Sequence, residues 1–589
     1  MTDQPKKSPG FFRELKRRNV YTVAIGYIAL AYLALQFVDL LIPSTRLPDW
    51  ADEFFLALAI VGFPIALIIG WVFEMTSGGV HWTQPEGDKE ADGTSMFIKW
   101  QPIVAAVILI MLSIFAWVSL TEPESTSVEE IGPVVAVLPF ETLGSAQANA
   151  FTEGIHVGVL TRLSSVSGLK IISRTSVRAY RNTEKALPQI ARELGATWVV
   201  LAEVQEVGSN VLVNARLIKA VDDRQVWAQD YRRTISAETI FEIQSELASS
   251  IIKALHARIS PSEERRIEQT PTLSLEAYRL QVLGRRESDK RTADGLQRGA
   301  ELFQQAIDLD PNYAAAWVGL AESLAITYDY GYSDDEDLLV QAEKASQHGI
   351  ELDPESGEAH AVMGVIHFAR HEGPESILAL NRAIDLQPSN GGAYSWLSWG
   401  SLLFGDVDEG IKNGKRAVAV DPLSGEAVSN LALSFLSKGE YEKGLTESQH
   451  SLQLLPEWST ARLYKGAALY HLGRYAEAEN VLTGLTVEWA GSGASSALAL
   501  AMLAQGDNAG ALGLLKTLEQ SDDPFSAGLV HAALGDFDSA YQSWLHGDNW
   551  NAWSTIAMRY LYPDVLGPLR DDPLFAEIIA NLDRKWGLN

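Results

Sequence analysis

A regular spacing of prolines and glycines in the C-terminal half constrains the fold more than any other feature of this sequence. Prolines that end predicted helices lie at positions 311, 354, 388, 422 and 456, and the last four are 34 residues apart. Glycines at 405, 439 and 473 share this period. Glycine permits a tight turn between two helices, and proline stops the second one. The spacing therefore predicts an array of stacked helix pairs.

The residues inside each unit support this prediction. Ala383–Pro388 (AIDLQP) and Leu472–Ala478 (LGRYAEA) place small residues and turn formers as two packed helices require. On these residues, the chain over about 275–547 resembles the tetratricopeptide-repeat family. The resemblance implies an all-α superhelix with a concave groove lined by the first helix of each pair. Residues 548–589 are predicted to form C-terminal capping helices.

One unit is longer than the others, because Pro311 and Pro354 are 43 residues apart. Tyr328–Asp337 (YDYGYSDDED) is the predicted place of the nine extra residues. We expect a solvated loop there, with a carboxylate calcium site as the alternative.

Extending the period from the prolines gives a set of candidate groove residues that is mostly apolar and aromatic. This set predicts that a protein or peptide partner binds as an extended or helical segment with hydrophobic anchors. For each position, a place in the core between repeats is the alternative. The candidates are Val318, Ile326, Val365, Phe368, Ser395, Trp399, Leu402, Leu433, Leu436, Leu463, Tyr470 and His471.

Residues 132–258 alternate between strand and helix patterns. A β-branched run at Val134–Phe140 comes first, helical spacing follows at Ala148–Leu163, and two paired strands are predicted at Val211–Ala220 and Arg224–Thr234. Such alternation predicts a small α/β domain with a mixed sheet.

Three motifs in this domain carry a second resemblance. They are Val135–Phe140 (VAVLPF), Phe151 with Gly154, and Ile172–Ser176 (ISRTS). Together they resemble the N-terminal domain of TolB and the FlgO-like domains, which implies a non-enzymatic module in the periplasm or at the cell surface. The chain departs from that pattern at Ile155–Gly158 and Glu203–Gln205.

The first 120 residues contain three apolar runs, Tyr21–Ile42, Phe54–Phe73 and Pro102–Leu120. At about 1.5 Å of rise per residue, each helix can cross the roughly 30 Å hydrocarbon core of a bilayer. Residues 21–120 are therefore predicted to form a membrane domain of three transmembrane helices in contact with the lipid bilayer.

Basic residues indicate the orientation of these helices. Residues 1–20 carry Lys6, Lys7, Arg13, Lys16, Arg17 and Arg18, whereas the first loop carries only Arg46. The positive-inside rule then places the N-terminus in the cytoplasm. We expect a multi-pass protein of the bacterial inner membrane, with an acidic linker at 121–131 and everything after residue 120 in the periplasm.

Composition excludes several functions. The net charge of −28 argues against nucleic-acid binding over a broad surface. The absence of cysteine excludes thiol catalysis and cysteine-bound metals. No phosphate-binding loop, HExxH or GxSxG motif occurs. We therefore expect no enzyme activity and no cofactor.

The sequence predicts a periplasmic scaffold anchored in the membrane; the alternative is a signal-transduction subunit that acts through a cytoplasmic partner.

Overall fold

The computed structural model describes residues 132–143, 148–485, 493–520, 523–546 and 550–588, together with 73–76, 79–82 and positions 27 and 29. The chain forms two units, Met1–Thr126 and Ser127–Asn589. In the first unit, β1 (Phe73–Thr76) and β2 (Gly79–Trp82) form an antiparallel hairpin.

The three predicted membrane runs lie outside the described residues, apart from Tyr27, Ala29 and Phe73. Among the residues that the structure does describe, no helix combines the length and the apolar character that crossing a bilayer requires.

The second unit begins with the small mixed sheet that the sequence predicts. Its strands are β3 (Val134–Val137), β4 (Glu141–Leu143), β5 (Lys170–Ile171), β6 (Trp198–Val207), β7 (Asn210–Lys219) and β8 (Arg224–Thr234). The strand order is β5-β3-β6-β7-β8, and β4 pairs with β6. β3 runs parallel to β5 and β6, whereas β6, β7 and β8 form an antiparallel meander.

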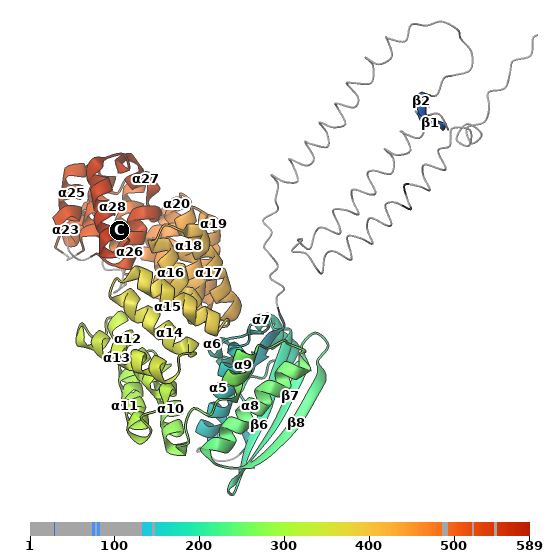
Figure 1. The fold of residues 1–589 in the computed structure, drawn as a ribbon. Coiled ribbons are helices and arrows are strands. Elements are labelled where there is room, and N and C mark those ends of the chain that lie inside the picture. The colour runs from blue at the N-terminus through green and yellow to red at the C-terminus, as the bar shows by residue number, and fades with distance from the viewer. Residues whose placement is uncertain are drawn as a thin grey trace, which may run out of the picture. The chain divides into compact units, whose positions relative to one another are not determined.

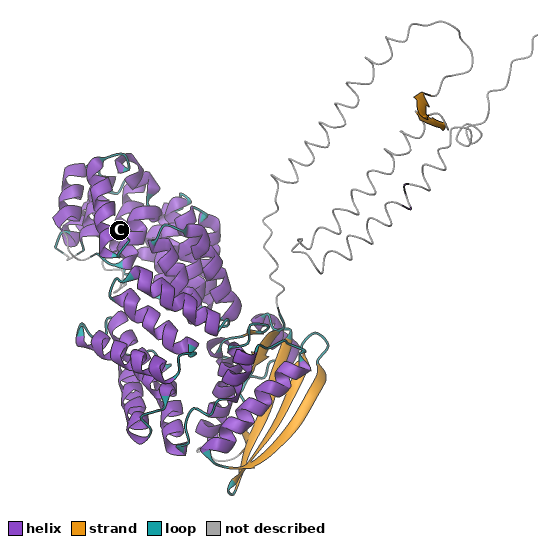
Figure 2. Ribbon diagram, viewed as in Figure 1, coloured by secondary structure: helices purple, strands orange, loops and turns teal. Residues whose placement is uncertain are grey.

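Helices complete this α/β domain, and two of them pack together against the sheet (Figures 1 and 2). The helices are α5 (Ala148–Ser164), α6 (Arg174–Arg178), α7 (Leu187–Leu194), α8 (Ala237–Ala254) and α9 (Pro261–Glu268). Helix α5 buries Phe151, Ile155, Val159 and Leu163, at most 5% exposed, because residues four apart share one helix face. These side chains and those of α8 form one core with the strands.

The C-terminal half is a helical-repeat superhelix that resembles tetratricopeptide repeats. The described helices pair as α10 (Leu275–Ser288) with α11 (Ala293–Leu309), α12 (Ala314–Asp329) with α13 (Asp337–Leu352), α14 (Gly357–Ala369) with α15 (Gly373–Leu386), α16 (Gly391–Leu403) with α17 (Val407–Val420), α18 (Gly425–Lys438) with α19 (Tyr441–Leu454), α20 (Ser459–His471) with α21 (Tyr475–Leu482), α22 (Gly493–Ala504) with α23 (Asn508–Leu518), and α24 (Pro524–Ala533) with α25 (Phe537–His546). Consecutive first helices also contact one another, from α10 through α24.

The periodic prolines follow the ends of second helices, and the periodic glycines lie in turns, as the sequence predicts. The second helices α11, α13, α15, α17 and α19 each end two residues before a proline of the series. Gly405, Gly439 and Gly473 adopt φ values of 89°, 82° and 71°, which ordinary side chains avoid. A second series caps the first helices: Ser356, Asn390 and Ser424 each accept a backbone N–H three residues on.

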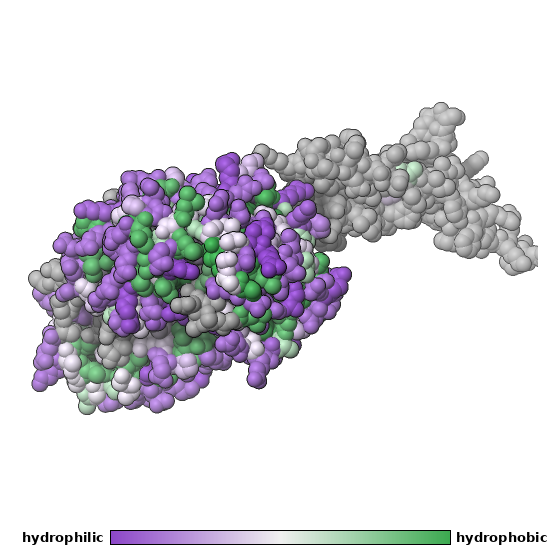
Figure 3. All heavy atoms as spheres, turned by 90° about the horizontal axis from the view of Figure 1, so that it is seen from below, coloured by the Kyte–Doolittle hydropathy of each residue, from purple (hydrophilic) through white to green (hydrophobic). Residues whose placement is uncertain are grey.

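The chain ends in α26 (Ala552–Ile556), a π-helical turn (Ala557–Leu561), α27 (Pro563–Leu566), a 3₁₀ turn (Gly567–Leu569) and α28 (Pro573–Lys585). On the face shown in Figure 3, hydrophilic residues separate the hydrophobic ones into small patches.

Candidate functional site

The Ile172–Ser176 motif joins the α/β domain to the repeats. Ser173 donates its N–H to the carbonyl of Val420 (2.8 Å), and the Ser176 hydroxyl donates to Asp421 Oδ1 (2.5 Å). The same hydroxyl accepts the N–H of Leu423 (2.8 Å). Burial raises the pKa of Asp421, while the two serines oppose that shift. The motif thus holds the loop between α17 and α18 against the edge of the sheet.

Two further contacts extend this interface. Ile171 donates its N–H to Ser389 Oγ in the loop between α15 and α16 (3.0 Å). Arg174 bridges Glu153 on α5 and Asp289 after α10, at 3.1 and 2.6 Å. The α/β domain is therefore attached to three parts of the repeat array, and not only through the chain connection at α9 and α10.

The predicted groove holds the C-terminal segment of the same chain, residues 551–588. One hydrophobic core contains both groove residues and residues of this segment. The groove residues in that core are Phe368, Leu402, Leu433, Leu436, Leu463 and Tyr470, and Trp399 packs against it. The sequence predicts helices here that cap the last repeat. The helices form, and they also reach back along the first helices as far as α14.

Specific contacts show how far this segment extends. The Trp586 ring lies 5.2 Å from Phe368 and 4.5 Å from His371, both at the end of α14. Further along, the Tyr470 hydroxyl donates to Asp564 Oδ2 (2.6 Å), and His471 bonds the carbonyl of Leu561. Burial and this carboxylate raise the pKa of Tyr470.

The buried apolar side chains of the C-terminal segment make it part of the core. Trp553, Ile556, Met558, Leu561, Tyr562, Leu566, Phe575, Ile578, Leu582 and Trp586 are all at most 5% exposed. At roughly 1.5–3 kcal/mol for each buried apolar side chain, their burial contributes on the order of 15–30 kcal/mol as an upper estimate. The conformational entropy lost when the segment is ordered opposes this gross gain. The shared burial shows that the segment belongs to the folded core.

Val318, Ile326, Val365 and Ser395 lie outside this shared core, and Trp399 and His471 lie at its edge. Val318 and Ile326 are 3% and 8% exposed, and Val318 belongs to a core between α12, α13 and α14. Val365, Ser395, Trp399 and His471 are partly exposed. Partner binding by these residues stays a prediction.

Ion pairs that link different repeats are a feature that the apolar groove prediction misses. Arg285 on α10 makes two bonds to Glu358 on α14, at 2.8 and 3.2 Å. Arg291 pairs with Glu322 on α12 at 3.1 Å. The Glu358 carboxylate raises the pKa of Arg285 despite its burial. No periodic sequence signal marks these pairs, because their partners lie 73 and 31 residues apart at unlike positions of their units.

The nine-residue insertion packs against distant repeats. It lengthens α12 and α13 and forms the turn between them. The Tyr330 hydroxyl donates to Glu426 Oε1 at the start of α18 (3.1 Å), and the Tyr332 hydroxyl donates to the carbonyl of Arg291 (2.9 Å). Burial, and then the charge of Glu426, raises the pKa of Asp329 to about 7. Tyr330 and Tyr332 thus hold the first half of the insertion against other repeats. Asp334–Asp337 is exposed, as expected for a solvated loop.

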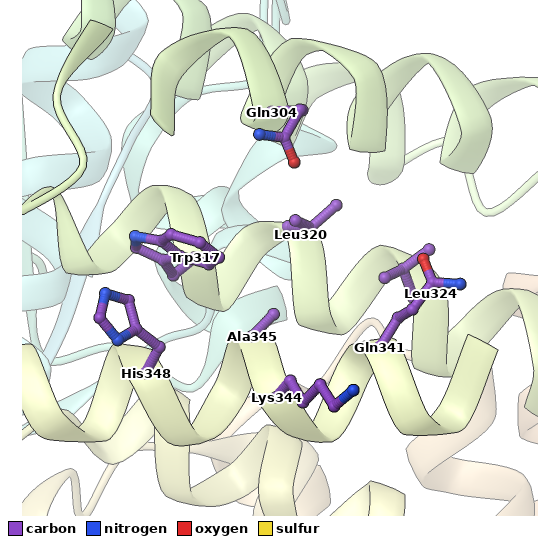
Figure 4. Close-up of a pocket in the computed structure, with 8 residues that line it drawn as sticks. All are labelled: Gln304, Trp317, Leu320, Leu324, Gln341, Lys344, Ala345 and His348. Carbon is purple, nitrogen blue, oxygen red and sulfur yellow. The ribbon is translucent and has the colours of Figure 1, made fainter. Parts of the chain in front are cut away.

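A cavity of about 440 Å³ lies over α12, between α11 and α13 (Figure 4). Trp317, Leu320, Leu324 and Ala345 form its apolar floor. Its polar rim consists of Gln304, Gln341, Lys344 and His348. The Trp317 ring stands edge-on to His348 at 4.6 Å and donates its Nε1–H to the carbonyl of Pro311 (2.9 Å). No pattern in the sequence singles out the residues around this cavity.

Comparison with known proteins gives partial matches. No family model matches the chain. "Putative adenylate cyclase 3" of Rhizobium meliloti (strain 1021) is 30% identical over 236 residues, which is 40% of this chain and 40% of that protein. The transcriptional regulator HilA of Salmonella typhimurium is 20% identical over 241 residues, 40% of this chain and 42% of that protein. The chain thus spans about two fifths of the length of the curated relatives it matches.

Solved structures of helical repeats also match. YrrB, described as a tetratricopeptide-repeat protein with an unusual peptide-binding site, is 16% identical, covers 34% of this chain and 96% of its own, and has a TM-score of 0.23. A repeat protein of Parabacteroides merdae is 15% identical, covers 44% and 98%, and has a TM-score of 0.31. At these TM-scores, the neighbours carry no argument about what this chain binds.

Proposed function

We propose that this protein is a membrane-anchored, non-enzymatic scaffold that binds a protein or peptide partner through its repeats. The observation that carries the proposal is the array from α10 to α25, in which helix pairs repeat with the period of the prolines. Stacked pairs present long surfaces that recognise extended or helical segments of other proteins. The chain offers no catalytic motif that competes with this function.

The proposal places the protein in a bacterial inner membrane, with residues after 120 in the periplasm. The three apolar runs and the basic residues before Tyr21 support this location. The similarity to an adenylate cyclase covers 40% of each chain, so cyclase activity is not carried over.

A topology assay and a crosslinking panel test the proposal together. Alkaline phosphatase fused after Leu120 should be active, whereas a fluorescent reporter that folds only in the cytoplasm should stay dark there. Photo-crosslinkers at exposed repeat positions in the full-length chain should capture a specific protein in living cells. A cytoplasmic fusion result, or a panel without any captured protein, contradicts the proposal.

The second candidate is a subunit that relays binding at the repeats towards the membrane. The contacts of Ser173 and Ser176 with the α17–α18 loop favour it, since a change in the repeats reaches the α/β domain directly. The partial relatives are named as a putative adenylate cyclase and a transcriptional regulator. A cytoplasmic protein that co-purifies with wild type and is lost in Ser176→Ala supports the relay; equal recovery argues against it.

A further inference from the structure

The cavity over α12 exposes apolar side chains at first-helix positions that are buried on α16 and α18, whereas the partly exposed equivalents on α14 and α20 are His360, His367, Arg462 and Lys465. The proline period relates Trp317, Leu320 and Leu324 to Tyr394, Leu397 and Ser401 on α16, which are 8%, 3% and 7% exposed. The equivalents on α18, Val428, Leu431 and Phe435, are 0%, 4% and 5% exposed. On α12 all three side chains are only partly buried. The Trp317 indole and two leucine side chains are therefore partly exposed to solvent in the unit that carries the insertion.

The rim of this cavity carries Lys344, and Glu343 and Glu351 lie with it along the adjoining cavity over α13. Lys344 is exposed and forms no ion pair with any residue in the described part of the chain. Its neighbours are engaged: Glu343 pairs with Arg370 (2.6 Å) and His348 lies 3.4 Å from Glu351. A second cavity, of about 310 Å³, continues over α13 past Lys344. The cavity thus places a cation without an ion pair in the described part of the chain beside an apolar floor.

We propose that this cavity docks a partner protein segment that inserts one aromatic or long aliphatic side chain and places a carboxylate beside Lys344. This inference rests on the proposed scaffold function and names its site and the chemistry of its partner. The volume of about 440 Å³ accommodates one large side chain with part of its backbone. The C-terminal segment fills much of the concave groove, which leaves this surface on the side of α11 and α13 open.

The test uses the full-length protein in living cells, with the photo-crosslinker p-benzoylphenylalanine at Gln304 as the probe. Gln304 is exposed at the rim, on the opposite side of the cavity from α13. Mass spectrometry of the product identifies the crosslinked peptide. We expect a Trp, Phe, Leu or Ile in that peptide within four residues of an Asp, a Glu or a free C-terminus.

Two variants probe the cavity without altering the core. Lys344→Glu should lower the crosslinking yield about fivefold to tenfold, because an exposed ion pair is lost and replaced by repulsion of similar size. Gln341→Trp fills the rim and should lower the yield more than tenfold. Lys412→Glu is the matched control: it occupies the same repeat position as Lys344, two units on, over covered equivalents of the floor. It should leave the yield unchanged.

Three results overturn the inference: equal yields in wild type and both variants, a crosslinked peptide without an apolar anchor near a carboxylate, or a crosslink to a second copy of this chain. A crosslinker at Leu378, which is 74% exposed on α15, separates the two proposals. If it captures a partner and Gln304 does not, the scaffold function stands and the cavity proposal fails. If no repeat position captures a partner, both fail.

Discussion

Trp586, three residues from the C-terminus, anchors the C-terminal segment to the middle of the repeat array. Its side chain is 2% exposed, contacts Phe368 and His371, and donates its Nε1–H to Thr555 Oγ1 (3.4 Å). A buried tryptophan removes roughly 200 Å² from water, which corresponds to about 5 kcal/mol at 25 cal/mol per Å². Trp586→Ala should therefore lower the free energy of unfolding by about 3–5 kcal/mol, the usual range for such a truncation.

The assay is urea unfolding of the full-length protein in detergent, followed by pulse proteolysis. Hydrogen exchange in α14 adds a second measurement, since protection there should fall although Phe368 lies more than 200 positions before Trp586. Leu574→Ala on α28 is the control: Leu574 is 43% exposed, and its truncation should cost under about 0.5 kcal/mol. If Trp586→Ala costs no more than this control, or α14 protection is unchanged, the segment does not pack as described and the energetic argument fails.

Three further predictions concern the rest of the fold. Burial lowers the pKa of His156 from 6.5 to about 4. The unfolded chain therefore binds the proton first, and stability is complete above pH 6.5 and falls by roughly 3 kcal/mol towards pH 4; in His156→Gln, urea titrations across that window should lack this loss. Ser176→Ala should cost about 1–3 kcal/mol, because it removes one donor to Asp421 and the acceptor of the Leu423 N–H, and hydrogen exchange in α6 should become faster; unchanged exchange contradicts the interface. Gly439→Ala, at φ 82°, should lower the melting temperature by a strain of about 1–2 kcal/mol, whereas Gly513→Ala inside α23 should not lower it.

The repeat array could be predicted from the sequence because its signals are local. A proline stops a helix and a glycine turns the chain wherever they stand, so the ends of α15 and α17 follow from Pro388 and Pro422. The same holds for the α/β domain, where the predicted strands at 211–220 and 224–234 are observed as β7 and β8. The three predicted membrane helices lie outside the described residues and stay a prediction.

The candidate site could be predicted only in part. Periodicity indicates that Phe368 and Tyr470 sit on first helices, and it does not say what covers them. Their neighbours, Trp586 and Asp564, lie 218 and 94 residues away in the sequence. No sequence pattern marks the cavity at Trp317, because its lining comes from three helices, α11, α12 and α13, that meet only in the folded chain.

The sequence by itself determined the kind of elements and their order: a period of helix pairs, a small mixed sheet before it, and an acidic chain without cysteine. These properties arise from neighbours within a few residues, which local sterics and helix or strand period control. The tertiary structure decided which surfaces are covered by other segments of the chain and which stay exposed. The C-terminal segment fills much of the groove, the ISRTS motif holds the repeats, and the cavity over α12 stays open. Such choices depend on contacts between distant segments, whose packing energies no local pattern records.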